Sequence, residues 1–171
     1  MRKSTESNAP VVIVGGGPVG IALAIDLGLR GIRSIVVERH GEPQPIPKGQ
    51  NLTQRTMEHF HFWGAEDELR AARTIPHDYG IGGMTSYGTL LSGYNYDWLQ
   101  RELVRPFYFT GNERLPQYAT EAVLQRRAAQ IAAVELMYGW TCTAVRSDEA
   151  GVEIDIVDRG GATARPGHSG S

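Results

Sequence analysis

The sequence predicts an α/β fold built on one strand–helix–strand unit between Val11 and Glu38. The β-branched run Val11–Val14 is short and apolar enough for a strand that is buried on both faces. An apolar segment with helical character follows and continues to Arg30. A second strand-like run, Ile35–Val37, then ends in Glu38. A helix between two short apolar strands is typical of a parallel sheet.

Three glycines join the first strand to the helix in the pattern Gly15-x-Gly17-x-x-Gly20. Gly15 suits a tight turn, Gly17 lets the backbone approach a pyrophosphate, and Gly20 allows close helix–strand packing. Pro18 fits the first helical turn, because the N–H that proline lacks would have no partner there. The unpaired N–H groups and the dipole at a helix start attract phosphates. The pattern therefore predicts a Rossmann-like nucleotide site, and an ordinary glycine turn is the alternative.

The residues around this motif complete its context. Glu38 follows Gly20 by 18 residues and ends the second strand. A carboxylate there can accept both hydroxyl hydrogens of an adenosine ribose and would repel a 2′-phosphate, so the nucleotide should lack one. Ala24 and Leu27 are predicted to contact the sheet, and Gly31 is predicted to cap the helix.

Length, charge and cysteine content restrict the classes of function. A chain of 171 residues is large enough for one domain with a real core. The net charge of −2, without a basic block, argues against nucleic acid and against an anionic membrane surface as partners. Cys142 is the only cysteine, which excludes an internal disulfide and fits a reducing cytoplasm. The sequence has no run of 18 apolar residues that would predict a membrane span.

Both ends of the chain are predicted to lie outside the packed domain. Residues 1–10 are polar and are expected to be flexible. Residues 159–171 contain four glycines, one proline and no large apolar residue, which predicts a disordered tail. The domain is therefore expected to cover residues 11–158.

A proline-rich segment follows the second strand. Pro43, Pro45 and Pro47 predict an extended loop that leaves the carboxyl end of that strand. Ligands bind at this edge in parallel sheets, so Lys48 is expected near a cofactor. Contact with the cofactor and a solvated surface position both remain open for this lysine.

Two helices are predicted next, from Leu52 to Trp63 and from Glu66 to Arg73, with Gly64 between them. His59 and His61 lie in the first of these helices. Two residues apart on a helix, they face different ways, and no carboxylate–histidine pattern accompanies them, which argues against a metal site.

Glycines alternate with aromatic residues from Ile75 to Gly111, which predicts short strands and turns. These aromatic side chains could form a wall under a flavin or facing an aromatic substrate, but a role in the core is favoured.

The last third of the chain is predicted to alternate between strands and one helix. The expected elements are a short strand at Leu115–Tyr118, a helix from Glu121 to about Ala132 capped by Thr120, strand segments Glu135–Tyr138 and Thr141–Val145 around a Gly139 kink, and a hairpin whose turn is Ser147–Gly151 and whose second strand includes Val152, Ile154 and Ile156.

Three segments in this order resemble one family: VVIVGGGPVGIALAIDLGLRGIRSIVVER, PKGQNLTQRTMEHF and LPQYATEAVL, followed by the strand–turn–strand that ends at Val157. Together they resemble the N-terminal part of the class A FAD-dependent monooxygenases, which include para-hydroxybenzoate hydroxylase and the aromatic polyketide hydroxylases. The resemblance covers residues from about Val11 to Val157. It implies a Rossmann-like FAD-binding domain with additional strands, incomplete relative to the family.

The resemblance also implies roles for individual residues. The counterpart of Glu38 holds the adenosine ribose, and Arg39 lies on the adenine side. Lys48 stands where the family usually has an arginine near the flavin or pyrophosphate; it keeps the charge but loses the planar guanidinium. Gln117 matches a glutamine that reaches FAD, and the strand around Val145 matches a segment whose backbone passes the adenine.

The chemistry that the resemblance implies is hydroxylation of a small aromatic or polyketide-like substrate with NAD(P)H and O2. FAD carries this chemistry while the protein binds and shields it. No catalytic acid, base or nucleophile can be named from the sequence, and no metal ligands are assigned.

The later Asp-Gly and Gly-Asp motifs of the family do not occur in the sequence. We therefore expect a truncated portion that is not active alone and has an apolar edge that favours self-association. An NAD-dependent oxidoreductase domain and a non-enzymatic nucleotide-binding remnant are the two alternatives.

Overall fold

The computed structural model describes residues 6–46, 48–76, 84–97, 101–149 and 151–167. The chain divides into two compact units, of which one comprises Met1–Ile46 with Thr120–Ser171 and the other Pro47–Ala119. The sequence predicted a single domain for residues 11–158. The first unit contains the glycine motif, and the two units are described separately.

The first unit is built on a parallel sheet with the strand order β2-β3-β8. Strand β2 (Val11–Val14) pairs with β3 (Ser34–Glu38), and β3 pairs with β8 (Val134–Tyr138). Helix α1 (Pro18–Leu29) connects β2 to β3 and covers one face of the sheet. The predicted strand–helix–strand unit is therefore confirmed, and all three carboxyl ends lie at one edge.

Strand β3 is buried on both faces. Successive side chains of a strand point to opposite sides, so the two faces have different neighbours. Val36 packs with Ile13 and with Ala24 of α1, as predicted for that helix. Ile35 and Val37 belong to a separate apolar cluster on the other face. A continuous apolar run is what such a two-sided environment requires.

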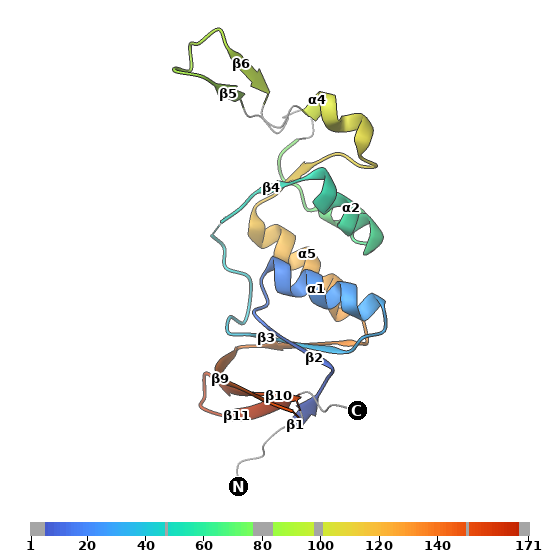
Figure 1. The fold of residues 1–171 in the computed structure, drawn as a ribbon, viewed down its shortest axis with the longest axis vertical. Helices are drawn as coiled ribbons and strands as arrows, with labels where there is room; N and C mark the ends of the chain where they lie inside the picture. Colours follow the sequence, from blue (N-terminus) through green and yellow to red (C-terminus); the bar gives the residue numbers. More distant parts are fainter. Residues whose placement is uncertain (1–5, 47, 77–83, 98–100, 150, 168–171) are drawn as a thin grey trace. The chain divides into compact units, whose positions relative to one another are not determined.

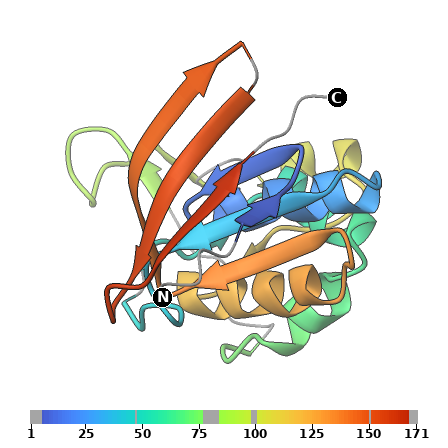
Figure 2. The same ribbon diagram turned by 90° about the horizontal axis from the view of Figure 1, so that it is seen from below.

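A second sheet covers the face of the parallel sheet opposite α1 (Figure 1). Its order is β1-β11-β10-β9, formed by β1 (Glu6–Asn8), β11 (Thr163–Gly167), β10 (Gly151–Asp158) and β9 (Trp140–Asp148). Figure 2 shows that β9, β10 and β11 run obliquely across the parallel strands. Strands β9 and β10 form the predicted antiparallel hairpin.

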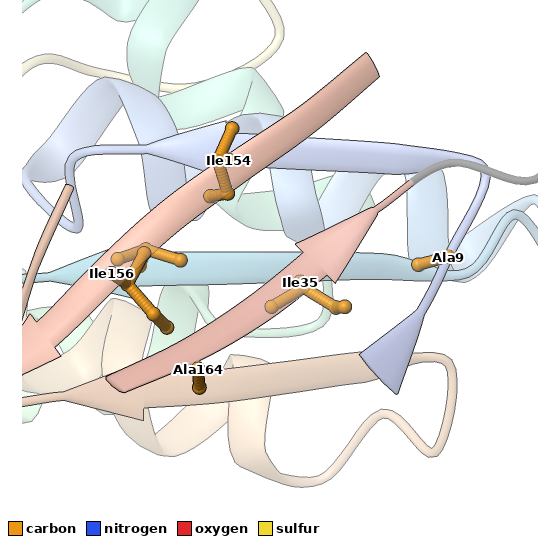
Figure 3. Close-up of a cluster of buried hydrophobic side chains, with 6 residues drawn as sticks. Ala9, Ile35, Ile154, Ile156 and Ala164 are labelled. Atoms are coloured by element: carbon orange, nitrogen blue, oxygen red, sulfur yellow. The ribbon is translucent and has the colours of Figure 1, made fainter. Parts of the chain in front are cut away.

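The interface between these two sheets is an apolar cluster (Figure 3). Ile154 and Ile156 of β10 and Ala164 of β11 pack with Ile35 of β3. Of the three apolar residues predicted for β10, Ile154 and Ile156 are buried, whereas Val152 is 38% exposed. Glu153, between Val152 and Ile154, is exposed as well.

Gly139 separates β8 from β9 and has a φ of +78°. The sequence predicted a kink within one strand. In the structure β8 belongs to the parallel sheet and β9 to the antiparallel one, so this glycine marks the change of sheet. The left-handed backbone conformation makes glycine the favoured residue there.

Both predicted unstructured ends contain strands. Residues 1–10 were expected to be flexible and 159–171 disordered, but β1 pairs with β11 and β11 pairs with β10. Ala164 is only 2% exposed. The prediction is wrong for these strands. A segment without large apolar residues can still form a strand when a neighbouring strand supplies backbone hydrogen bonds and a small side chain is buried. Residues 1–5 and 168–171 lie outside the described part.

Strand β2 is less buried than predicted. Ile13 is buried, but Val14 is 56% exposed. The strand forms one edge of the three described parallel strands, so it has a neighbour on one side only.

In the second unit both helices are shorter than predicted. Helix α2 (Gln54–Phe62) starts after Thr53, whose hydroxyl accepts a hydrogen bond from the Thr56 N–H at 3.3 Å. Leu52, predicted as helical, belongs instead to β4 (Asn51–Leu52), which pairs with β7 (Glu113–Arg114). Gly64, with a φ of +68°, ends this region as expected, and α3 (Glu66–Ala71) confirms the second helix.

Helix α5 (Gln117–Ala129) starts earlier than predicted. The strand predicted at Leu115–Tyr118 is wrong, since Gln117 and Tyr118 are helical and the Ala119 N–H donates to the Pro116 carbonyl at 3.0 Å. Thr120 is buried inside the helix and is not its cap. The helix buries one face, which includes Val123, Leu124 and Ala128.

The glycine- and aromatic-rich segment forms β5 (Met84–Ser86), β6 (Asn95–Asp97), α4 (Arg101–Val104) and the 3-10 turn η2 (Arg105–Phe107). The two short strands confirm the prediction, and the helical turns were not anticipated.

The aromatic side chains of this segment were predicted to be part of the core. This prediction is wrong for the exposed ones, which include Tyr87, Tyr94, Phe107 and Phe109. Six residues that the sequence analysis drew on lie outside the described part of the chain, namely Pro47, Tyr79, Gly80, Gly82, Gly83 and Trp98.

The packing of β11 can be tested with two alanines of the same segment. We expect Ala164→Gln to lower the free energy of unfolding by about 2 kcal/mol, because a larger polar side chain must enter a closed cluster. Ala162→Gln is the matched control, since Ala162 is exposed and should change stability by less than about 0.5 kcal/mol. Urea unfolding measures both, and equal stability of the two variants would contradict the packing of β11.

Candidate nucleotide-binding site

The glycine turn has the geometry that its sequence predicts. Gly15 has a φ of +112°, and its N–H donates to the Val37 carbonyl at 2.8 Å, which ties the turn to β3. A Cβ atom at Gly20 would overlap with the Gly15 carbonyl oxygen, so the close approach requires glycine there. Pro18 is the first residue of α1. These observations confirm the predicted tight turn and close packing.

The start of α1 is open toward an incoming group. Gly17 occupies the N-cap position, and no described side chain caps the helix or places a carboxylate in its first turn. A Cβ atom at Gly17 would meet nothing within 4 Å. Open space beside unpaired helix N–H groups fits an anionic group such as a pyrophosphate.

Glu38 lies over this turn and is held from two sides. Its Oε2 accepts a hydrogen bond from the Gly16 N–H at 2.7 Å, and its Oε1 accepts one from the His40 N–H at 2.8 Å. A carboxylate has further acceptor capacity, so both oxygens can still accept ribose hydroxyl hydrogens. The sequence did not identify Gly16 or His40. The run of three glycines was the only signal for the former.

Tyr138 adds a side chain that the sequence did not single out. It is the last residue of β8 and pairs with Glu38 across the sheet. Its hydroxyl oxygen is buried and has no hydrogen-bond partner among the described residues. Burial, together with the nearby charges of Glu38 and Glu121, raises the pKa of this phenol to about 12. The hydroxyl is therefore a neutral donor at physiological pH.

The loop after Glu38 carries a small polar cluster. The Arg39 Nε donates to the His40 Nε2 at 3.1 Å, and the Gln44 amide lies 3.2 Å from the same ring nitrogen. Arg39 is exposed and directly follows Glu38. Its predicted place beside the adenine remains a prediction.

Two predicted cofactor residues belong to the unit Pro47–Ala119. Lys48 is exposed in the loop, and Gln117 is the first residue of α5. The Gln117 Oε1 lies 3.5 Å from where a Cβ atom of Gly49 would be, so the glutamine is beside this loop. The structure thus brings Gln117 and the Lys48 loop together within one unit, and their contact with FAD stays a prediction.

Val145 lies in the second sheet of the first unit. It belongs to β9, pairs with Ile154 and is 62% exposed. The structure therefore places this residue on a strand outside the parallel sheet. That the backbone around Val145 passes the adenine remains a prediction.

A separate pocket in the unit Pro47–Ala119 is lined by His61, Gly64, Glu66, Asp67, Phe109 and Thr110. Burial alone would raise the pKa of Glu66, but hydrogen bonds from Arg70, Thr110 and His61 hold it below its ordinary value. The two carboxylates of this pocket make it unsuitable for a pyrophosphate.

The two histidines considered for metal binding have other contacts. His59 stacks on Trp63 with ring centroids 5.4 Å apart, and His61 lies 3.0 Å from Glu66. Within the described ranges, no three histidine, cysteine or acidic side chains are grouped closely enough to hold a metal ion.

Comparison with known families identifies the domain that carries this glycine turn. The family described as "FAD binding domain" matches residues 8–165, which is most of the chain. The chain belongs to this FAD-binding domain family. The resemblance to class A flavin monooxygenases is thereby confirmed, together with the Rossmann-like fold class.

Two monooxygenases of Streptomyces are among the proteins to which this chain is similar. Rifampicin monooxygenase of Streptomyces venezuelae is 32% identical over 149 residues, which cover 86% of this chain and 28% of the relative. The 12-dehydrotetracycline 5-monooxygenase/anhydrotetracycline 6-monooxygenase of Streptomyces rimosus is 33% identical over 146 residues, covering 85% and 26%. The chain thus spans less than a third of the length of these relatives.

Solved structures give the same fold. The flavin-dependent monooxygenase PieE, in complex with FAD and substrate, is similar with a TM-score of 0.79 and 26% identity, covering 95% of this chain and 29% of that chain. The OxyS anhydrotetracycline hydroxylase of Streptomyces rimosus gives a TM-score of 0.71 and 28% identity, covering 96% and 30%. In the described part of this chain, no helix has the length and apolar character needed to cross a membrane.

The open space at Gly17 makes a sharp test of the nucleotide position. We expect Gly17→Val to weaken ADP binding at least about tenfold, because the side chain would occupy the place of the pyrophosphate. Stability should change by less than about 1 kcal/mol, since the new side chain meets no neighbour and the φ of −72° suits any residue. Calorimetric titration and urea unfolding measure the two effects.

Gly20→Ala is the contrasting variant. Its Cβ atom would overlap with the Gly15 carbonyl, so it should lose roughly 2 kcal/mol of stability. Unchanged ADP affinity in a folded Gly17→Val protein would exclude this turn as the binding site.

Proposed function

We propose that this chain is the FAD-binding portion of a flavin-dependent monooxygenase that hydroxylates an aromatic or polyketide-like substrate with NAD(P)H and O2. The observation that carries the proposal is the Glu38 carboxylate held over an uncapped glycine turn, in a chain of the FAD-binding domain family. The start of α1 would provide the anion site and Glu38 the ribose acceptor, both at one edge of a parallel sheet.

The residues of the turn fit the ADP part of FAD. The pyrophosphate would lie at the start of α1, beside Gly15, Gly17 and Pro18, where N–H groups are unpaired. Glu38 would accept the ribose hydroxyl hydrogens. Arg39, exposed immediately after it, would flank the adenine. We assign no catalytic acid, base or nucleophile.

Three further residues would complete the cofactor contacts. Lys48 would supply a positive charge toward the flavin or pyrophosphate, and Gln117 an amide from the start of α5. The backbone near Val145 would pass the adenine. When bound, FAD supplies the redox chemistry with NAD(P)H and O2, while these residues bind and orient it.

The names of similar proteins support the substrate class. They include rifampicin monooxygenase, anhydrotetracycline 6-monooxygenase and a putative polyketide hydroxylase of Streptomyces halstedii. A small molecule is therefore the proposed partner. The net charge of −2 argues against nucleic acid as a partner. The single cysteine supports a cytoplasmic location.

The exposed apolar side chains of Tyr87, Leu91, Phe107 and Phe109 support self-association of the isolated chain. A non-enzymatic nucleotide-binding role would use the same fold and differ only in activity. The family match favours FAD over an NAD-dependent oxidoreductase domain.

Substitution of Glu38 tests the ribose assignment. We expect Glu38→Gln to weaken ADP binding by about 1 to 3 kcal/mol, the scale of a charged hydrogen bond. The variant should also reduce the rejection of 2′-phospho-ADP, because the negative charge is removed. Glu42→Gln, an exposed neighbour with the same change of charge, is the control and should bind ADP normally. Equal calorimetric affinities of the parent protein for ADP and 2′-phospho-ADP would count against this role of Glu38.

The activity of the 171-residue chain can be tested directly. We expect weak FAD binding at most, and any NAD(P)H oxidation should yield hydrogen peroxide instead of a hydroxylated phenol. Oxygen transfer requires a site closed to water, and the turn at Gly15–Gly17 holds only the ADP end of the cofactor. Product analysis after reconstitution with FAD, NAD(P)H and a panel of phenols is the measurement. Coupled formation of a hydroxylated product would show that this expectation is wrong.

A further inference from the structure

The carboxylate of Glu113 is enclosed within the unit Pro47–Ala119. Its side chain belongs to β7 and is only 1% exposed. Its Oε2 accepts a hydrogen bond from the Arg70 guanidinium of α3 at 3.0 Å. Its Oε1 accepts one from Arg73, whose side chain is 7% exposed. Because a buried charge is costly unless it is paired, the two guanidinium groups are what allow this carboxylate to be buried.

The Glu113 cluster, formed by Glu113, Arg70 and Arg73, joins segments that are distant in the sequence. The two arginines precede Glu113 by 43 and 40 residues. Arg73 also donates to the Ile75 carbonyl at 2.6 Å and to the Pro76 carbonyl at 3.0 Å. The cluster therefore ties α3 and the segment that follows it to β7.

The pairing of β7 with β4 depends on the same residue. Glu113 pairs with Leu52 in this two-stranded sheet. Two residues later the Leu115 N–H donates to the Gln50 carbonyl at 2.9 Å, and Leu115 is 1% exposed. A sheet of two short strands has little stability of its own, so contacts outside the sheet must hold it in place. The Glu113 cluster supplies such contacts.

The segments next to this small sheet carry the proposed flavin contacts. Gln117 begins α5 directly after Pro116, whose ring restricts φ and so limits the freedom of the chain between β7 and α5. Lys48 and Gly49 precede β4. The Gln117 Oε1 lies 3.5 Å from where a Cβ atom of Gly49 would be. The place of the Gln117 amide beside this loop therefore follows from how β7 pairs with β4.

We propose that Glu113 is a positioning residue for FAD: by holding β7 against β4, its cluster fixes the Gln117 amide beside the Lys48 loop. This inference rests on the proposed function and adds a residue that acts through Gln117 without touching the cofactor. An amide that is held in place before the ligand arrives loses less conformational freedom on binding, which raises the affinity.

The test begins with Glu113→Gln, which keeps the size of the side chain. Glutamine has one acceptor oxygen, so its NH2 group would face one of the two guanidinium groups. We expect this variant to bind FAD about three- to tenfold more weakly in flavin-fluorescence titrations, the effect of about one hydrogen bond. Its calorimetric affinity for ADP should equal that of the parent, because ADP lacks the flavin and is assigned to the turn at Gly15–Gly20 and to Glu38.

A double-mutant cycle separates positioning from a general loss of structure. Gln117→Ala should weaken FAD binding by at least the same factor as Glu113→Gln. If Glu113 acts through Gln117, Glu113→Gln should cause no further loss in the Gln117→Ala protein. Additive losses, an equal loss of ADP and FAD affinity, or an FAD affinity of Glu113→Gln equal to that of the parent would overturn the proposal.

Glu58→Gln is the matched control. Glu58 is a partly buried carboxylate of the same unit that also pairs with an arginine, Arg55, at 2.9 Å, but it lies on α2. We expect this variant to bind FAD as the parent does.

A second variant keeps the test decisive if Glu113→Gln does not fold. Arg73→Lys retains the positive charge but loses the planar group that reaches Glu113 and the two backbone carbonyls. It should give the same pattern, namely weaker FAD binding, unchanged ADP binding and no further loss in the Gln117→Ala protein. Additive losses would again contradict the positioning role.

The outcomes also distinguish this inference from the proposed function. If the parent binds neither ADP nor FAD, the proposed function fails and the role of Glu113 fails with it. If Gln117→Ala binds FAD as the parent does, the contact of Gln117 with FAD is wrong, and so is a role of Glu113 through it. If Gln117→Ala weakens FAD binding and Glu113→Gln does not, only the inference about Glu113 is wrong.

Discussion

The pair of hydrogen bonds that the Glu38 carboxylate accepts from the Gly16 and His40 N–H groups is the constraint on which the site depends. One bond fixes the glycine turn against the end of β3, and the other fixes the start of the following loop. The carboxylate is therefore oriented before any ligand arrives. Such preorganisation lowers the cost of ordering a site on binding.

Strand β3 makes this arrangement possible because it is packed on both faces. Val36 contacts the helix side through Ala24, and Ile35 contacts β10 through Ile154 and Ile156. A strand held in this way gives Glu38 a fixed position at its carboxyl end. The polar edge is thus supported by two apolar layers, which is the usual arrangement of a ligand site in an α/β sheet.

The sequence predicted the part of the site whose signals are local. The Gly15–Gly20 turn follows from glycines that a positive φ and a close approach require, and the β9–β10 hairpin follows from alternation around a turn. Strand β11 could not be predicted, because its stability comes from neighbouring strands and not from its own composition. The place of Tyr138 beside Glu38 was equally hidden, since it arises only when β8 pairs with β3.

The central claim is that the carboxyl edge of β2, β3 and β8 binds the ADP part of FAD. The most direct measurement is a titration of the 15N-labelled chain with ADP, followed through the backbone amide resonances. The account predicts the largest shifts at Gly15–Gly20, Glu38–His40 and Tyr138. Shifts confined to the pocket of His61, Glu66 and Thr110, or no shifts at any ADP concentration, would contradict it.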